Sequence, residues 1–349
     1  MSSSKEPLLV GLDIGSHTVK VCQLRPGKDG LELMALGNTV LPIDAVEDGR
    51  IQDDAAVGEA ISRLFRNLKI SERRVGVSVS GYSVIVKKIS TEILSEQDLA
   101  AHIPTVAEQY IPFDIKDVYL DYQDLHTISA DKQRTDVLLI AAKKEIIDGY
   151  LQLLERLRLK PMLVDVDSFA LENIYELTSG AAENVALVDI GASTININII
   201  AGGNSLLARD IVAGSRQITE LIARRLGIDE AEAERLKLGL VPPGEHQKEI
   251  EEMYLGTCTQ WILEIKKNLD LYRAKNAANP VQKIVLSGGG SRVQGLEGFI
   301  KQETGLEVSH VNPFANIRFN PKKLDEDYVR NLAPEMAIAA GLAIRPARW

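Results

Sequence analysis

Cysteines, aromatic side chains and long apolar runs are all scarce in this sequence of 349 residues. The two cysteines, Cys22 and Cys258, form no CxxC pair and no metal-ligand spacing, which argues against a disulfide scaffold. No window approaches the roughly 20 apolar residues that a membrane-spanning helix needs. The residues up to Pro7 are polar and lack the apolar core of a signal peptide. We therefore expect a cytoplasmic protein that is peripheral to a membrane only through a partner.

Two common phosphate-binding motifs are also missing, the Gly-x4-Gly-Lys-Ser/Thr loop and a Gly-x-Gly-x-x-Gly turn after the first strand. The formal net charge of -9 argues against general binding of nucleic acid or anionic membranes. What is present is a composition of 45% hydrophobic and 26% charged residues, typical of a globular protein with a sizeable core. At this length the chain has room for two domains.

A short apolar run near the N-terminus ends in a polar turn and restarts at once, which predicts a β-hairpin over residues 9–24. Gly15 in the turn has no Cβ, so the backbone can approach a ligand closely. Successive amides of such a turn can point at an anion. Asp13, just before the turn, can hold Mg²⁺ through water, and Lys20 supplies a point charge for phosphate. Alone, this pattern is commonly just a structural hairpin.

The same pattern recurs in the second half of the chain. Residues 186–190 form an apolar strand that contains Asp189, residues 191–194 form a small polar turn, and residues 195–200 restart as a strand. The duplication predicts two similar halves that each give a hairpin to one phosphate site. Asp13 and Asp189 are then the candidate Mg²⁺ ligands. The alternative is a chance match between two unrelated hairpins.

Two further glycine elements fit a nucleotide site. Gly288, Gly289 and Gly290 follow an apolar strand and precede a helix, whose N-terminus favours anions. Gly214 stands just before another expected helix. Each element is weak evidence when taken alone, because such turns are common.

Residues 81–144 interrupt the repeated units and predict an inserted α+β subdomain. Ser95 begins a capping box for a helix that Pro104 should bend or shorten, and strands are expected at residues 118–125 and 136–142 around a polar loop at 129–135. The insert is rich in aromatic side chains for a chain with 5% aromatic residues. They either form its own small core or line a groove for a partner peptide, with Val84, Tyr110, Ile111 and Phe113 as the candidate walls.

Two facing hairpins resemble the phosphate loops of the actin-like ATPase superfamily. The order also matches, with connecting helices at residues 165–171 and 335–341 and an adenosine motif at residues 286–292. The resemblance implies an α/β, ribonuclease H-like fold of duplicated β-β-β-α-β-α units that binds ATP and Mg²⁺. It also implies that Glu234 and Lys237 pack on the adenosine. The implied domains are residues 1–170 plus 335–349, with the insert at 81–144, and residues 171–334.

Within that superfamily the chain resembles the PilM family of type IV pilus assembly most. The residues that carry this resemblance are Gly11–Ser16 with Val19 and Lys20, and above all the insert run 107–113 with Asp121 and Tyr122. The resemblance implies a scaffold or switch that docks the cytosolic N-terminal peptide of the inner-membrane protein PilN. The resemblance also implies contacts with other pilus machinery, including the assembly ATPase. His17 departs from the Ser or Thr that is usual there, which leaves open a turn residue that simply faces solvent.

The candidate site residues follow from the motifs and from this resemblance. Asp13 and Asp189 are the metal ligands. The cofactor-binding candidates are Gly15, Ser16, His17, Thr18, Lys20, Gly191, Ala192, Ser193, Thr194, Gly214, Glu234, Lys237, Gly288, Gly289, Gly290 and Arg292.

Catalysis is implied only by the resemblance, which sets Asp167 in register to orient an attacking water, with Asp165 as a second choice. The alternative is that both carboxylates cap the following helix. An aspartate is one methylene shorter than glutamate, so we expect slow ATP hydrolysis at most. Two other functions share the fold, an FtsA-type cell-division filament protein and a small-molecule kinase. The first would need a C-terminal amphipathic helix and the second a set of substrate-binding carboxylates, and we identify neither in the sequence.

Overall fold

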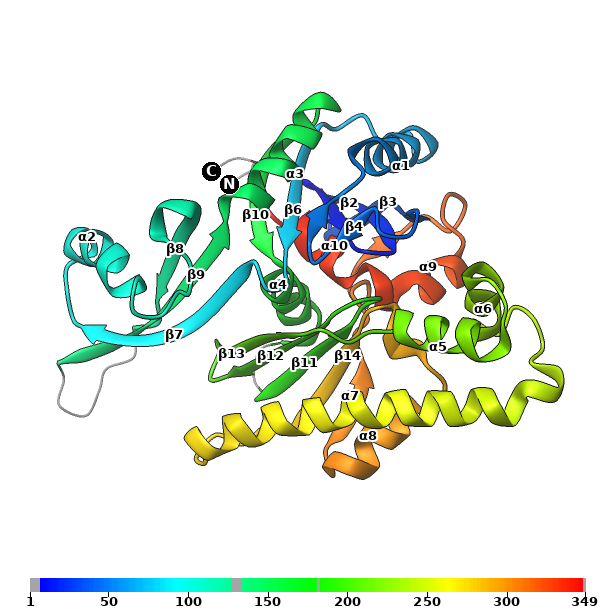
Figure 1. Cartoon of the computed structure of the whole chain (residues 1–349). Helices are drawn as coiled ribbons and strands as arrows, with labels where there is room; N and C mark the ends of the chain where they lie inside the picture. Colours follow the sequence, from blue (N-terminus) through cyan, green and yellow to red (C-terminus); the bar gives the residue numbers. More distant parts are fainter. Residues whose placement is uncertain (1–6, 127–132, 181–182, 348–349) are drawn as a thin grey trace.

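Two mixed β-sheets form the centre of the molecule in a computed structural model, which describes residues 7–126, 133–180 and 183–347 (Figure 1). The first sheet has the strand order β10-β6-β1-β2-β3-β16 and the second the order β13-β12-β11-β14-β15. The strands of the first sheet are β1 (Val10–Ile14), β2 (Thr18–Gly27), β3 (Gly30–Val40), β6 (Arg74–Val79), β10 (Lys160–Val166) and β16 (Arg318–Phe319). Those of the second are β11 (Val185–Ile190), β12 (Ile195–Ala201), β13 (Asn204–Ile211), β14 (Lys283–Ser287) and β15 (Glu307–His310).

The two sheets repeat one local pattern, as the duplicated hairpins predict. β1 pairs with β2 antiparallel and with β6 parallel. β11 likewise pairs with β12 antiparallel and with β14 parallel. Every residue of β1 and of β11 is buried, which explains why these strands read as continuous apolar runs. The only charged residues in the two strands, Asp13 and Asp189, therefore stand out.

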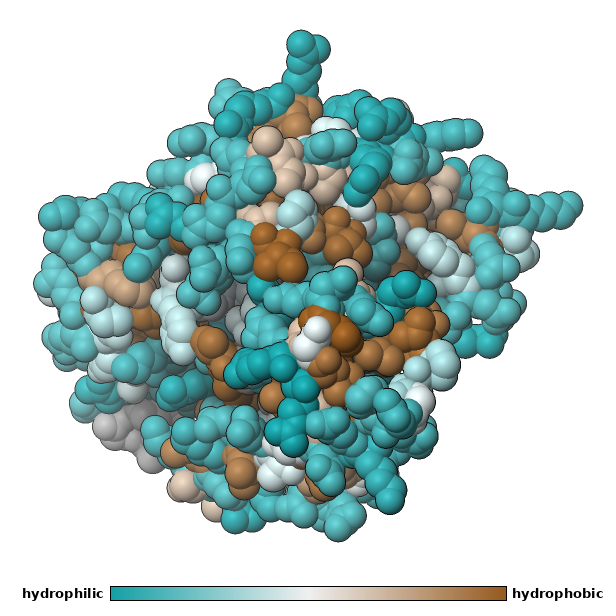
Figure 2. Space-filling model, turned by 45° about the vertical axis from the view of Figure 1, so that its right-hand side comes forward, coloured by the Kyte–Doolittle hydropathy of each residue, from teal (hydrophilic) through white to brown (hydrophobic). Residues whose placement is uncertain are grey.

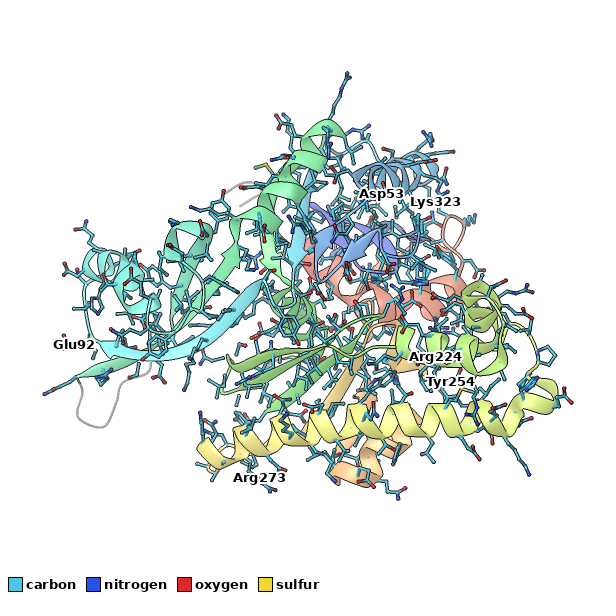
Figure 3. All side chains as sticks on the ribbon, in the orientation of Figure 1. Asp53, Glu92, Arg224, Tyr254, Arg273 and Lys323 are labelled. Carbon is cyan, nitrogen blue, oxygen red and sulfur yellow. The ribbon has the colours of Figure 1, made fainter. Side chains whose placement is uncertain are left out.

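Helices cover both sheets, and each covered face has its own core. The apolar faces of α1 (Asp54–Asn67) and α3 (Lys144–Arg156) pack on the first sheet. Asp53, labelled in Figure 3, accepts a hydrogen bond from the amide of Ala56 and so caps the start of α1. Helices on the second sheet are α5 (Arg216–Leu226), α6 (Glu230–Lys237), α7 (Gln247–Lys275) and α8 (Leu296–Thr304).

A third core joins the two halves around α4 (Asp167–Ser179) and α10 (Ala337–Ala343). All seven residues of α10 are buried and small or aliphatic. A Cβ on Gly11 of β1 would overlap the carbonyl oxygen of Ala339, and one on Gly341 would overlap that of Ala170 in α4. Glycine at these two positions therefore lets α10 lie directly against β1 and α4.

The insert forms a separate lobe beside the first sheet (Figure 1). It comprises β7 (Val84–Glu92), α2 (Glu96–Ala107), β8 (Val118–Asp124) and β9 (Arg134–Lys143), with strand order β7-β9-β8. Ser95 caps α2 as predicted, and the helix contains Pro104 yet continues to Ala107. Glu92 marks the end of β7 that lies far from the main body (Figure 3). Most of the loop predicted at 129–135 lies outside the described residues.

Several short elements differ from the sequence-based expectations. The hairpin of β4 (Val46–Glu47) and β5 (Arg50–Ile51) and the strands β15 and β16 were not predicted, and neither was α9 (Glu326–Leu332). The connecting helix expected at 335–341 begins as a 3₁₀ turn at Ala333–Met336 before α10. Strands of two to four residues are too short to show a period, so the sequence could not indicate them.

The outer surface is largely hydrophilic on the face drawn in Figure 2, where hydrophobic residues reach the surface in several patches. Within the described ranges, no helix is both long enough and apolar enough to cross a membrane.

Candidate functional site

The turns of the two repeated hairpins meet. Each turn is closed by the same bond, from the Gly15 amide to the Thr18 carbonyl oxygen at 3.0 Å and from the Gly191 amide to the Thr194 carbonyl oxygen at 2.9 Å. The Ser193 hydroxyl then donates to the Ser16 hydroxyl across the gap at 2.7 Å. The amides of Gly15 and Gly191 are thus used inside their own turns, and any phosphate contact would fall to later residues of each turn.

A cavity of about 90 Å³ lies where the turns meet. It brings together twelve of the residues proposed from sequence, namely Asp13, Gly15, Ser16, His17, Thr18, Lys20, Asp167, Asp189, Gly191, Ala192, Ser193 and Thr194. The walls also include residues that sequence reasoning missed, among them Ser78, Ser80, Gly81, Tyr150 and Asn196. Ser78 is the penultimate residue of the apolar strand β6 and Ser80 follows its last residue, and that position was the available signal. Tyr150 looked like any other apolar residue of its helix.

Charge in the cavity is dominated by three aspartates and one lysine. Lys20 Nζ lies 2.9 Å from Asp13 Oδ2. Burial alone would lower the pKa of Lys20, but the charge and hydrogen bond of Asp13 raise it above its usual value. Burial raises the pKa of Asp167 to about 7, with a further contribution from the charge of Asp13. Burial also raises the pKa of Asp189 to about 6. The site therefore favours a bound cation or proton beside these carboxylates.

The residues present fit a Mg²⁺ ion that is shared with a ligand. Asp13 and Asp189 are both buried in the cavity wall, at exposures of 5% and 7%. Among the residues described, no group of three or more His, Cys, Asp or Glu side chains could hold a metal ion by itself. Mg²⁺ commonly uses only one or two carboxylates, with waters and substrate phosphates completing its shell. These two carboxylates would hold such an ion, which would neutralise phosphate charge.

A second group of predicted residues lies beside the turns rather than in the cavity wall. A Cβ on Gly214 would overlap the carbonyl of Ala192, which explains the glycine there. Lys237 pairs with Glu234 at 2.7 Å and donates to the Ser215 carbonyl oxygen at 3.4 Å. Burial lowers the pKa of His17, and the charges of Glu234 and Lys237 also act on it. Gly214 therefore adjoins the second turn, and the Glu234–Lys237 pair acts on His17 of the first turn. His17 is not a turn residue that simply faces solvent.

The third glycine element joins the second half to the start of α10. Gly288 has φ +83° and lies against the carbonyl of Ile190, and its amide donates to the Pro334 carbonyl oxygen at 2.9 Å. Arg292 pairs with Glu335 at 2.9 Å, and Glu335 also accepts from Asn38 of β3 at 3.2 Å. Gly288, Gly289, Gly290 and Arg292 do not line the cavity, but Gly288 and Gly290 lie against Ile190 and Gly191, where the second turn begins.

The two candidate catalytic aspartates separate in space. Asp167 lines the cavity, whereas Asp165 belongs to β10 and does not. The interpretation that both cap the following helix is wrong, because the N-cap of α4 is Val166 and makes no side-chain capping bond. Among the described residues, Asp165 Oδ2 has no hydrogen-bond partner, and it lies 3.6 Å from Arg345 Nη1. Only Asp167 is placed to act on a ligand in the cavity.

The candidate partner residues lie mostly inside the insert. Ile111 is 5% exposed and belongs to the insert's own core, on which Tyr110 and Phe113 pack. The Nζ atom of Lys87 lies 4.7 Å from the centre of the Tyr110 ring, and that of Lys143 lies 4.6 Å from the centre of the Phe113 ring. Val84 packs instead on the core of the first sheet. The aromatic residues at 110 and 113 thus behave as a small core with one face covered by lysine, the first of the two alternatives.

Comparisons with known proteins agree with this architecture. The family of the type IV pilus assembly protein PilM matches residues 11–347. A solved PilM-PilN type IV pilus biogenesis complex contains a chain of 25% identity, with a TM-score of 0.87 over 99% of this chain and 100% of that one. Cell division protein FtsA of Bacillus subtilis (strain 168) is 25% identical over 256 residues, which are 66% of this chain and 57% of that relative.

MreB5 of Spiroplasma citri bound to AMPPNP has 11% identity and a TM-score of 0.51, with 89% of this chain and 93% of that chain covered. This likeness concerns the fold, which is the actin-like fold that the sequence resemblance implied. Because this family matches residues 11–347, nearly the whole chain, the chain belongs to the PilM family of type IV pilus assembly proteins.

Proposed function

We propose that the chain binds Mg·ATP between its two halves and serves as a nucleotide-responsive scaffold in type IV pilus assembly. The observation that carries the proposal is the meeting of the two hairpin turns over the buried carboxylates Asp13 and Asp189. A relative with the same fold, MreB5 of Spiroplasma citri, has been solved with AMPPNP.

A nucleotide needs more room than the cavity offers. Ligand pockets usually measure about 300–1,000 Å³, and this cavity measures about 90 Å³. The proposal therefore requires the two turns to separate, which breaks the bond between Ser16 and Ser193. Phosphates would then meet the later turn residues, Lys20 and a Mg²⁺ held by the two aspartates.

Hydrolysis, in this proposal, is slow at most. Asp167 is the one candidate that could orient water, and its short side chain makes the approach imperfect; misplacement of about 1 Å can reduce a rate on the order of 10²-fold. With a pKa of about 7 it is also partly protonated at neutral pH. A turnover of about 1–10³ s⁻¹, the usual enzyme range, would contradict this part.

The proposed partner is the cytosolic N-terminal peptide of a PilN-type inner-membrane protein. This part of the proposal is supported by the similarity of the chain to a solved PilM-PilN complex. We propose that it docks where the insert meets the first half. β8 and β10 are both edge strands of their sheets, so an added strand could pair with either. After the larger effect of burial, the charge of Asp121 on β8 also raises the pKa of Asp165 on β10.

Tyr119 of β8 and Met162 of β10 are exposed apolar side chains on these two edge strands. Their exposed fractions are 45% and 39%. The Tyr119 hydroxyl donates to Asp148 of α3 at 2.9 Å, which holds its ring between the insert and the main body. A fixed tyrosine is a common anchor for a bound peptide.

The test is titration of a synthetic N-terminal PilN-type peptide into the protein. Tyr119→Ala should weaken peptide binding at least about tenfold, because loss of an anchor residue costs about 2 kcal/mol or more. Tyr328→Ala is the matched control, since Tyr328 is also 45% exposed but lies on α9. Equal affinity of wild type and Tyr119→Ala would place the docking site elsewhere, and absence of binding to wild type would refute the partner.

The proposal also covers where the protein lies in the cell and how its chain divides into domains. The protein would reach the inner membrane only through its partner, where other pilus machinery, including the assembly ATPase, could join. For the domains we keep the proposed division at 170/171 with an insert at 81–144. β16 already pairs with β3 of the first sheet, so we propose that the chain returns to the first half before residue 318 rather than at 335.

A further inference from the structure

One hydrogen bond joins the start of the insert to the second half of the molecule. The amide of Gly81 donates to Oδ2 of Asp210 on β13. The other carboxylate oxygen of Asp210, Oδ1, accepts from Nδ2 of Asn196 at 2.6 Å. Gly81 and Asn196 both line the cavity, so Asp210 is held by two residues of the cavity wall that belong to different halves.

Asp210 also acts on the cavity through its charge. After the larger effect of burial, it contributes to the raised pKa values of both Asp167 and Asp189. Burial raises the pKa of Asp210 itself, while the bonds from Asn196 and Gly81 oppose that shift. The carboxylate therefore sits at the edge of the candidate nucleotide site although it does not line the cavity.

The backbone at Gly81 can transmit a displacement to the whole insert. Gly81 has φ +87°, a conformation that side chains other than glycine rarely adopt. Its carbonyl oxygen accepts from the amide of Val84, the first residue of β7, at 3.0 Å. β7 packs against β13 and is part of the three-stranded sheet of the insert. A movement of Asp210 would therefore displace Gly81 and, with it, β7 at the start of the insert.

We propose that Asp210 is a positioning residue that ties the orientation of the insert to the separation of the two halves. A nucleotide that separates the Ser16 and Ser193 turns moves β13 relative to β6, and the Asp210 bond makes the insert follow β13. Nucleotide binding then changes the affinity of the junction between β8 and β10 for its peptide. This inference rests on the proposed function, of which it names the regulation.

Three variants separate the role of this bond from that of other contacts between the halves. Asp210→Ala removes both acceptor oxygens. Asp210→Asn keeps one oxygen for the Gly81 amide and should restore most of the effect. Asp44→Ala is the matched control, because it removes the ion pair between Asp44 and Arg216 at 3.0 Å, another contact between the halves that does not touch the insert.

The first measurement needs no ligand. Spin labels at Glu96→Cys in α2 and Glu252→Cys in α7 report the distance between the insert and the second half, and both native cysteines are buried. Double electron–electron resonance should give a narrow distance distribution for the unsubstituted background and for Asp44→Ala. The distribution should be at least about twofold wider for Asp210→Ala. Equal widths for Asp210→Ala and the background would overturn the inference.

The second measurement is the ratio of peptide affinities with and without a Mg²⁺ complex of a non-hydrolysable ATP analogue. We expect a ratio of about fivefold or more in wild type, within the usual range of allosteric coupling, and less than about twofold in Asp210→Ala. A wild-type ratio near one, or an unchanged ratio in Asp210→Ala, would overturn the inference. Failure of wild type to bind either ligand would instead refute the proposed function, and the spin-label distances would still test the Asp210 bond.

Discussion

Asp167 is the first residue of α4, and its carboxyl group faces the cavity with a pKa raised from 3.8 to about 7. Between these two values the folded protein holds a proton that the unfolded chain has released. Stability from this group is therefore complete below about pH 4 and is lost as the pH rises to about 7. Asp189 behaves in the same way up to its pKa of about 6. Acidic side chains at a cation site thus destabilise the fold at neutral pH when no cation compensates them.

Asp167→Asn should remove this pH dependence. The free energy of unfolding of the variant, relative to wild type, should rise between pH 5 and pH 8 by on the order of 1–3 kcal/mol. Urea unfolding at pH 5, 6.5 and 8 measures the difference, so that groups common to both proteins cancel. The exposed Glu59→Gln serves as control and should give a flat difference. A flat difference for Asp167→Asn as well would contradict the buried, proton-binding carboxyl.

The helices and strands that could be predicted from the sequence are those with a clear residue pattern. The paired hairpins, the Ser95 cap of α2 and the connecting helix that contains α10 all appear in the structure. The two turns were predicted to meet because they repeat, and they do. Gly81 and Tyr150 were missed as cavity residues, because only packing of distant segments brings them there. Ile111 was expected on a groove wall but is buried, since an apolar side chain in a short segment suits a core equally well.

Close packing of α10 makes a direct prediction for two glycines in helices. Gly341→Ala should destabilise the protein by about 1–3 kcal/mol or more, because its methyl group would overlap the carbonyl of Ala170 and force α10 away from α4. Gly298→Ala in α8 has nothing within 4 Å of its new methyl group and should be neutral or stabilising by up to about 1 kcal/mol. Thermal unfolding of the two variants compares them. Similar melting temperatures would show that α10 is not tightly packed.

For the whole molecule, two similar halves are joined by α4 and α10 and meet again at the hairpin turns, while the insert leaves the first half beside the same cavity. In this arrangement, both proposed activities depend on relative movement of the two halves. Ligand binding at the turns and peptide docking at the insert are then linked through few contacts, of which the Asp210 bond is one. Family membership is consistent with such a scaffold, which in this proposal depends on nucleotide binding at the hairpin turns.

Calorimetric titration of Mg·ATP measures this nucleotide binding, with wild type, Asp189→Ala and Asp13→Ala compared in the presence and absence of Mg²⁺. Asp29→Ala is the control, since it removes only an exposed ion pair with Arg318 at 2.7 Å. Wild type and the control should bind with equal affinity, and each cavity variant should lose about 1–3 kcal/mol of Mg²⁺-dependent binding free energy. Circular dichroism must show each variant folded. No binding to wild type, or equal binding by folded wild type and both cavity variants, would contradict the account.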